Sequence, residues 1–289
     1  MPDVEDVSYS REATIQAFRD YYRFLVELYM DGSCIIEPPE GGWPSISPEF
    51  QQASGKSDEV IELLRNLPYI RSDCPNDEFH PPQAAPGCYW ADWQSLAVDT
   101  VTDAAATKQP YMMSAEEGLK VTTEGAEWEN VPSHVIGLTS GHRENKIFLL
   151  DTKLGIIHWP ECDGGGDYRH NYDDDPSFID PVYDVDEHVP ENEQEWRSEP
   201  AWAIADLLEL FKMQYRKLKW IPVNTQQVVA TDFSFDESQD GMIPMLQGIF
   251  REHGWSLEQE GATHYRKREC MEAVDAALKE RYPSFEGWV

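Results

Sequence analysis

The sequence is short of positive charge. It has 23 Lys and Arg against 54 Asp and Glu, which gives a net charge of −31 at pH 7. Such an excess of carboxylates repels the phosphates of nucleic acids and of anionic membranes, because binding to either depends on basic side chains. We therefore expect no nucleic-acid partner and no membrane partner.

The sequence also lacks long hydrophobic runs and targeting motifs. No stretch approaches the roughly 18 uncharged apolar residues of a membrane-spanning helix, and neither end carries a lipidation motif. Residues 1–6 are acidic and have neither the basic nor the apolar region of a signal peptide. The five Cys are odd in number and contain no Cys-x-x-Cys pair. Reduced thiols are the simplest account, so we expect a cytoplasmic or nuclear protein.

Apolar side chains, by contrast, are plentiful. Hydrophobic residues make up 40% of the 289 residues and aromatic residues 12%, with ten Trp. That is too much apolar material for a disordered chain, and a chain of this length can bury a large core without disulfides. The composition indicates a globular protein.

Helices are predicted by apolar residues at three- and four-residue steps and by capping residues. Ser10 and Ser57 are suitable N-caps, and Pro48 suits a first helical position. Residues 89–101 fit a strand or a helix equally well. One predicted helix begins at Pro48, and the others cover residues 11–30, 58–67, 199–219, 242–253 and 264–281.

Three short apolar segments with turn residues between them predict strands at residues 134–139, 146–150 and 155–159. The short connections favour an antiparallel meander. We predict an α+β fold with an antiparallel or mixed central sheet and helices packed on it. Residues 1–235 are expected to form one domain, and residues 236–289 a helical extension on the same core.

Residues 161–199 form an acidic insert with fourteen Asp and Glu against two Arg. Its length and composition predict a surface loop. Three alternatives stay open: a solvated loop, a loop folded against basic residues of this chain, or a docking segment for a basic protein. Aromatic anchors are expected at Tyr172, Phe178, Tyr183 and Trp196. The candidate partner-binding residues are Asp173, Asp174, Asp175, Asp184, Asp186 and Glu187.

Potential metal ligands gather where the third predicted strand meets the insert. Imidazole and carboxylate groups together suit zinc or another divalent metal, although their spacing matches no defined motif. The alternative is an outward-facing strand residue followed by the first carboxylates of the insert. The candidate ligands are His158, Glu161, Asp163 and His170.

Two further motifs fail on their spacing. Residues 55–57, Gly-Lys-Ser, resemble the end of a phosphate-binding loop, but Phe50 stands where that loop requires Gly. Residues 236–241 resemble the first half of an EF-hand loop, but Gln247 replaces its final Glu. We interpret both as polar turns at helix ends.

The segment His-Val-Ile-Gly-Leu-Thr-Ser-Gly (residues 134–141), followed by Lys-Ile-Phe-Leu-Leu-Asp-Thr-Lys-Leu-Gly-Ile-Ile-His-Trp (residues 146–159), resembles the central sheet of the SUKH superfamily. That superfamily includes fungal regulators of cell-wall synthesis and bacterial toxin-immunity proteins. The resemblance covers about residues 133–220. It implies a mixed sheet with helices on one side and a protein-binding role without catalysis.

The sequence therefore favours a non-catalytic interaction or regulatory module that presents an acidic surface to a protein partner and has no cofactor. The alternative is a metal-assisted enzyme that uses His158, Glu161, Asp163 and His170.

Overall fold

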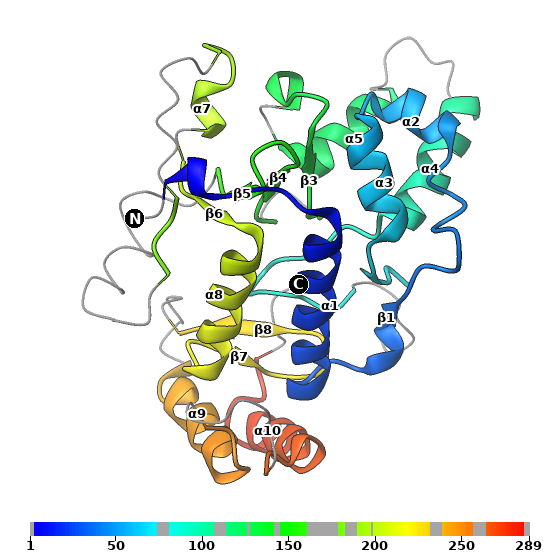
Figure 1. The fold of residues 1–289 in the computed structure, drawn as a ribbon. Helices are drawn as coiled ribbons and strands as arrows, with labels where there is room; N and C mark the ends of the chain where they lie inside the picture. The colour runs from blue at the N-terminus through cyan, green and yellow to red at the C-terminus, as the bar shows by residue number, and fades with distance from the viewer. Residues whose placement is uncertain are drawn as a thin grey trace.

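The structure is a computed structural model, and its arrangement of helices and antiparallel sheets confirms the predicted α+β fold (Figure 1). In the part of the chain that it describes, no helix has the length and apolar character needed to cross a bilayer. The described residues are 3–73, 81–106, 114–125, 128–141, 145–160, 179–182, 190–197, 199–231, 239–256 and 264–285.

The central sheet has four antiparallel strands in the order β3 (Val135–Gly137), β4 (Leu149–Asp151), β5 (Ile156–His158) and β6 (Ala201–Ala203). The first three confirm the predicted meander. The fourth corrects the sequence analysis, which assigned residues 201–203 to a helix. These residues pair with β5 instead, and the helix begins only at Ile204.

One face of this sheet forms part of the main core. Ile136, Leu150, Ile157 and Trp202 lie opposite one another on the four neighbouring strands, and all four are buried in the largest hydrophobic cluster. Successive side chains of a strand point to opposite faces, so the residues between them lie on the outer face.

Two helices cover the inner face: α1 (Arg11–Leu28) and α8 (Ile204–Arg216), which run side by side (Figure 1). The side chain of Ser10 accepts a hydrogen bond from the amide of Ala13, as predicted for an N-cap. Lys212 of α8 forms an ion pair with Asp20 of α1. The sequence pattern of α1 thus places its apolar stripe against the sheet and α8.

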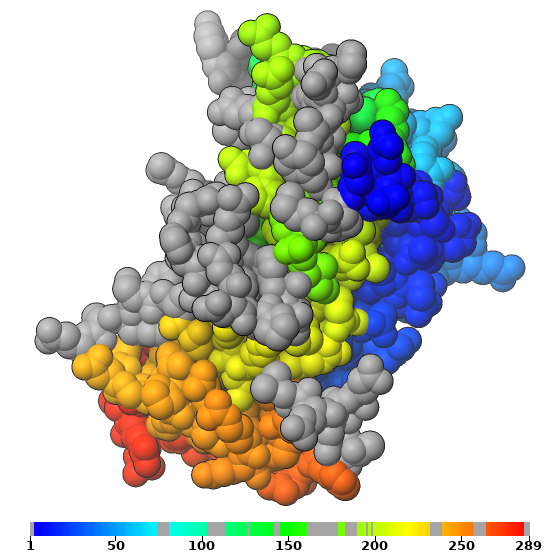
Figure 2. Space-filling model, turned by 60° about the vertical axis from the view of Figure 1, so that its left-hand side comes forward, coloured from blue at the N-terminus to red at the C-terminus, as the bar shows by residue number. Residues whose placement is uncertain are grey.

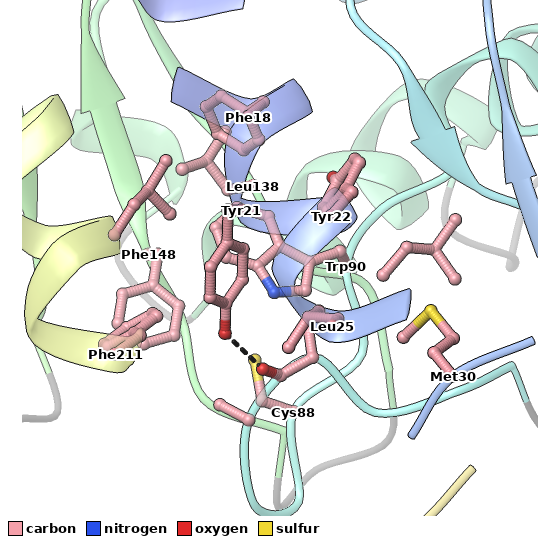
Figure 3. Close-up of a cluster of buried hydrophobic side chains, with 14 of the residues drawn as sticks. Phe18, Tyr21, Tyr22, Leu25, Met30, Cys88, Trp90, Leu138, Phe148 and Phe211 are labelled. Atoms are coloured by element: carbon pink, nitrogen blue, oxygen red, sulfur yellow. Dashed lines mark hydrogen bonds between the residues drawn. The ribbon is translucent and has the colours of Figure 1, made fainter. Parts of the chain in front are cut away.

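A loop, residues 81–91, passes through the core between these helices and the sheet. The hydroxyls of Tyr21 and Tyr215 both donate to the carbonyl of Ala84. Figure 3 shows Tyr21 pointing at this carbonyl, with Cys88 and Trp90 of the loop packed against α1. Tyrosine hydroxyls thus satisfy a backbone group that is shielded from water.

The same loop is tied to the chain's C-terminal half. The side-chain oxygen of Gln83 accepts from the backbone amide of Val228, and the backbone amide of Gln83 donates to the carbonyl of Gln226. Val228 begins β8 (Val228–Ala230), which pairs with β7 (Trp220–Pro222), and Gln226 lies just before it. The core therefore closes only with residues far apart in sequence.

Four helices form the upper right of Figure 1: α2 (Pro48–Ser54), α3 (Asp58–Asn66), α4 (Trp93–Ala106) and α5 (Ala115–Glu124). The ambiguous residues 89–101 thus mostly join a helix. Helix α5 was missed by the sequence analysis, although Ser114 and Glu117 form a capping box at its start.

The C-terminal helices α9 (Met242–Glu252) and α10 (Lys267–Arg281) lie at the bottom of Figure 1, and their buried residues belong to the main hydrophobic cluster. The shorter elements are η1 (Val4–Asp6), η2 (Gly32–Cys34), η3 (Trp128–Asn130), β1 (Ile35–Ile36), β2 (Tyr69–Ile70) and α7 (Gln194–Arg197).

Among the described cysteines, Cys88 and Cys270 are buried thiols that form no disulfide, whereas Cys34 is disulfide-bonded. The expectation that every thiol is reduced is therefore wrong for Cys34. A disulfide links residues that the fold brings together, and sequence spacing alone does not reveal such a pairing.

Candidate interaction site on the outer face of the central sheet

The outer face of the central sheet carries both predicted functional regions. Val135, Leu149, Ile156, His158 and Ala201 alternate with the inner-face residues and are all buried. A buried outer face means that other segments cover it. Those segments are the N-terminal turn and parts of the acidic insert.

The N-terminal turn covers the half of the outer face nearest β6. Val4 and Val7 pack against a small cluster that contains Ile156, Val182 and Ala201. The turn crosses the β4–β5 hairpin so closely that a Cβ on Gly155 would lie 2.7 Å from the amide nitrogen of Tyr9. The cover thus sits directly on the sheet.

The acidic insert is attached to the same half through residues 179–182. The amide of Val182 donates to the carbonyl of Ala201 at 2.8 Å. The indole Nε1 of Trp202 donates to the carbonyl of Ile179 at 3.0 Å. Figure 2 shows residues 179–182, in bright green, on the same face as the dark blue N-terminal turn.

Helix α7, at the other end of the insert, covers the half nearest β3. Its Trp196 is 1% exposed and packs with Val135, Ile147 and Leu149. This confirms Trp196 as an anchor of the insert. The other three expected anchors, Tyr172, Phe178 and Tyr183, lie outside the described residues.

Carboxylates surround the two attachment points. Glu5 and Asp6 of the N-terminal turn, Asp180 and Glu191 are exposed. The predicted partner-binding residues belong to the stretches between the attachment points, so they lie outside the described residues: Asp173, Asp174, Asp175, Asp184, Asp186 and Glu187.

His158, the only predicted metal ligand among the described residues, is fully buried on the outer face of β5. Its ring makes an edge-to-face contact with Trp196, with ring centroids 5.0 Å apart. Burial, assisted by the nearby charge of Arg197, lowers the pKa of His158 to about 3. The imidazole is therefore neutral at physiological pH.

The polar atoms of this pair are unsatisfied. Neither ring nitrogen of His158 has a hydrogen-bond partner in the described chain. The indole nitrogen of Trp196 has none either. Burying a polar group without a hydrogen bond costs about 1–3 kcal/mol. The outer face thus holds a costly polar pair inside an apolar cover.

A charged network borders this pair. The carboxylate of Asp151 accepts from the amides of Lys153 and Leu154, which fixes the β4–β5 turn, and its second oxygen lies 3.7 Å from Nε2 of His134. Burial is the largest influence on His134 and lowers its pKa. Arg197 of α7 forms an ion pair with Glu193 at 3.3 Å.

Of the four predicted metal ligands, only His158 lies among the described residues. Glu161, Asp163 and His170 lie outside the described residues, and the described residues alone contain no group of three potential ligands. The metal site therefore stays a prediction. The sequence analysis missed the pairing of His158 with Trp196, because strand and helix residues 38 positions apart meet only in the fold.

No family model, no curated protein and no solved structure matches this chain. The resemblance to the SUKH superfamily therefore stays a prediction.

Proposed function

We propose that the protein is a non-catalytic interaction module that presents its acidic insert to a basic protein partner. The observation that carries this proposal is the attachment of the insert to the outer face of the sheet at both Val182 and Trp196. The insert has fourteen carboxylates, and we propose that its two attachments present them on this face of the molecule.

The surrounding charge supports the same proposal. The N-terminal turn adds exposed Glu5 and Asp6, whereas Arg197 is paired with Glu193. Concentrated charge of one sign speeds the encounter with an opposite surface and disfavours partners of like charge. A basic protein is therefore the partner that this face fits.

The order of elements supports a SUKH-like module within this proposal. Strands β3, β4 and β5 follow one another as a meander, and helix α8 packs behind them on the inner face. The resemblance to that superfamily implies a protein-binding role without catalysis. We propose cytoplasm or nucleus as its compartment, and the disulfide at Cys34 is then an exception to the reduced thiols typical of these compartments.

The test compares two variants of equal charge. One replaces the six candidate partner-binding carboxylates of the insert by the corresponding amides. The control does the same to six exposed carboxylates elsewhere: Glu27, Glu40, Asp99, Glu129, Glu252 and Glu280. Each protein is used to capture partners from native extract of the source cells at several salt concentrations.

We expect the wild-type chain and the control to retain a stoichiometric, salt-sensitive partner that the insert variant loses. Equal loss from both variants would mean that net charge alone drives association. If the wild-type chain retains no stoichiometric partner at any salt concentration, the proposal is wrong.

A second candidate function is a metal-assisted enzyme, and His158 is the observation that favours it. A neutral imidazole with free nitrogens is the form that binds zinc. Metal analysis of the purified protein tests this candidate. If no metal is bound, and added zinc changes the melting temperature of wild type and His158→Ala equally, the candidate is excluded.

A further inference from the structure

The rings of His158 and Trp196 have hydrogen-bond donors and an acceptor that no neighbouring group satisfies. A neutral imidazole offers one N–H donor and one acceptor nitrogen, and an indole offers one N–H donor. All three nitrogen atoms are buried, and none has a hydrogen-bond partner in the described chain. The surrounding side chains of Val135, Ile147 and Leu149 are apolar and supply none.

The edge-to-face geometry accounts for only part of this capacity. The two ring planes stand at 88°. In such a pair one ring directs its edge at the face of the other, so at most one N–H is spent on the partner's π system. At least one donor and the acceptor nitrogen of the imidazole are left over. A matching ligand therefore has one acceptor and one donor.

The charges nearby select an uncharged ligand. Arg197 is paired with Glu193 at 3.3 Å, so these two groups add no net charge beside the rings. Burying a charged ligand among the apolar side chains of Val135, Ile147 and Leu149 would cost far more free energy than burying an uncharged one. An uncharged group with a donor and an acceptor close together fits these constraints, and a carboxamide is the simplest such group.

The cover over this site is attached to the sheet through one buried side chain, that of Trp196. Helix α7 has four residues, and a helix this short is not stable on its own. The burial of Trp196 holds it on the sheet, whereas the ion pair between Arg197 and Glu193 lies within the segment itself. Outward movement of α7 would expose the ring nitrogens of His158 and would leave the insert attached at Val182.

We propose that α7 is a lid and that His158 and Trp196 form a binding site for a carboxamide group. The imidazole acceptor takes an N–H of the ligand, and the remaining N–H donor binds its carbonyl oxygen. The apolar side chains around the pair exclude water and strengthen both hydrogen bonds. The site is distinct from the carboxylates that the proposed protein partner would contact.

The test follows the indole N–H of Trp196 by NMR in the full chain labelled with ¹⁵N-tryptophan, assigned with the variant Trp196→Phe. Acetamide is the probe, and acetone, which has a carbonyl but no N–H, is its control. We expect a saturable shift of the Trp196 signal with acetamide and at least a tenfold weaker response to acetone. A further titration with N-acetylglutamine methylamide shows whether a protein side chain binds better than the free amide.

The variant His158→Phe keeps the edge-to-face contact but has no ring nitrogen. We expect it to fold with a melting temperature equal to or above that of wild type, because an unsatisfied polar group is removed. Its Trp196 signal should no longer respond to acetamide. The inference is overturned if acetamide and acetone act alike, if Trp196 shows contact with water only, or if zinc shifts the signal and acetamide does not.

Discussion

The ammonium group of Lys56 lies 2.5 Å from Oε1 of Glu124, and both side chains are almost completely buried. Lys56 stands between α2 and α3, and Glu124 is the last residue of α5. Burial lowers the pKa of Lys56 and raises that of Glu124, while each partner's charge acts in the opposite direction. The ion pair therefore couples α5 to the helices beside it.

We predict that Glu124→Gln lowers the free energy of unfolding by about 3–5 kcal/mol, because it leaves the buried ammonium group of Lys56 without its counter-charge. Urea unfolding measures the change. The control is Glu116→Gln on the same helix, where the exposed pair with Lys120 contributes about 1 kcal/mol or less. The double variant Lys56→Met, Glu124→Leu should recover the wild-type value, and a double variant as unstable as Glu124→Gln would contradict this account.

Lys267 gives a second prediction. Its ammonium group donates to the carbonyls of Val26 and Met30, both at 2.6 Å, and so caps the C-terminal end of α1. We expect Lys267→Met to lower the free energy of unfolding by about 1.5–3 kcal/mol. The neighbouring Arg268→Met removes an exposed charge and should change it by about 0.5 kcal/mol or less. Equal effects in thermal unfolding would argue against a capping role.

Replacing Gly137 or Gly118 by Ala should change the free energy of unfolding in opposite directions. A Cβ on Gly137 would lie 1.9 Å from the carbonyl oxygen of Thr123, so Gly137→Ala must push α5 away from β3. We expect a loss of about 3 kcal/mol or more in unfolding free energy. Gly118 lies within α5 with nothing near its Cβ position, so Gly118→Ala should gain about 0.5–1 kcal/mol. A harmless Gly137→Ala would mean that α5 does not contact the sheet as described.

His158 predicts a pH dependence. Its pKa is about 3 in the folded state, against an ordinary value of 6.5. Because the folded pKa is depressed, the unfolded chain binds the proton first, and stability is lost as the pH falls from 6.5 toward 3. Relative to His158→Phe, wild type should lose about 1.4 kcal/mol per pH unit in this range. Parallel stability curves for the two proteins would show that His158 is not buried and neutral.

The cysteines are tested by counting thiols. A disulfide at Cys34 uses two of the five cysteines and leaves three. We expect three reactive thiols per chain after denaturation without a reductant, and five after reduction. The buried thiols of Cys88 and Cys270 should not react in the folded protein. Five thiols without a reductant would restore the expectation of fully reduced cysteines, which is typical of the cytoplasm.

Elements with a complete local signal could be predicted from the sequence. Ser10 and Ser57 begin helices as their side chains indicate, and the short turns between apolar segments yield β3, β4 and β5. Helix α5 was missed because its capping box is followed by few apolar residues. Strand β6 was missed because residues 201–203 show helical spacing, and only pairing with β5 makes them a strand.

The candidate site was less predictable, for a different physical reason. His158 was singled out for its chemistry, but its burial depends on Trp196, which reaches it from beyond the insert. No local pattern encodes this contact. The sequence pattern indicated that His158 is a potential ligand, and only the fold determined which residues it contacts.

The contacts of the loop of residues 81–91 also affect how the chain folds during its synthesis. Ala84 is held by Tyr215, and Gln83 by Val228, which is 145 positions later. While the protein is being synthesised, the first two hundred residues therefore lack the partners that enclose this loop. The growing chain keeps aromatic surface exposed until its last quarter has emerged from the ribosome, so we expect nascent chains to depend on chaperones during that interval.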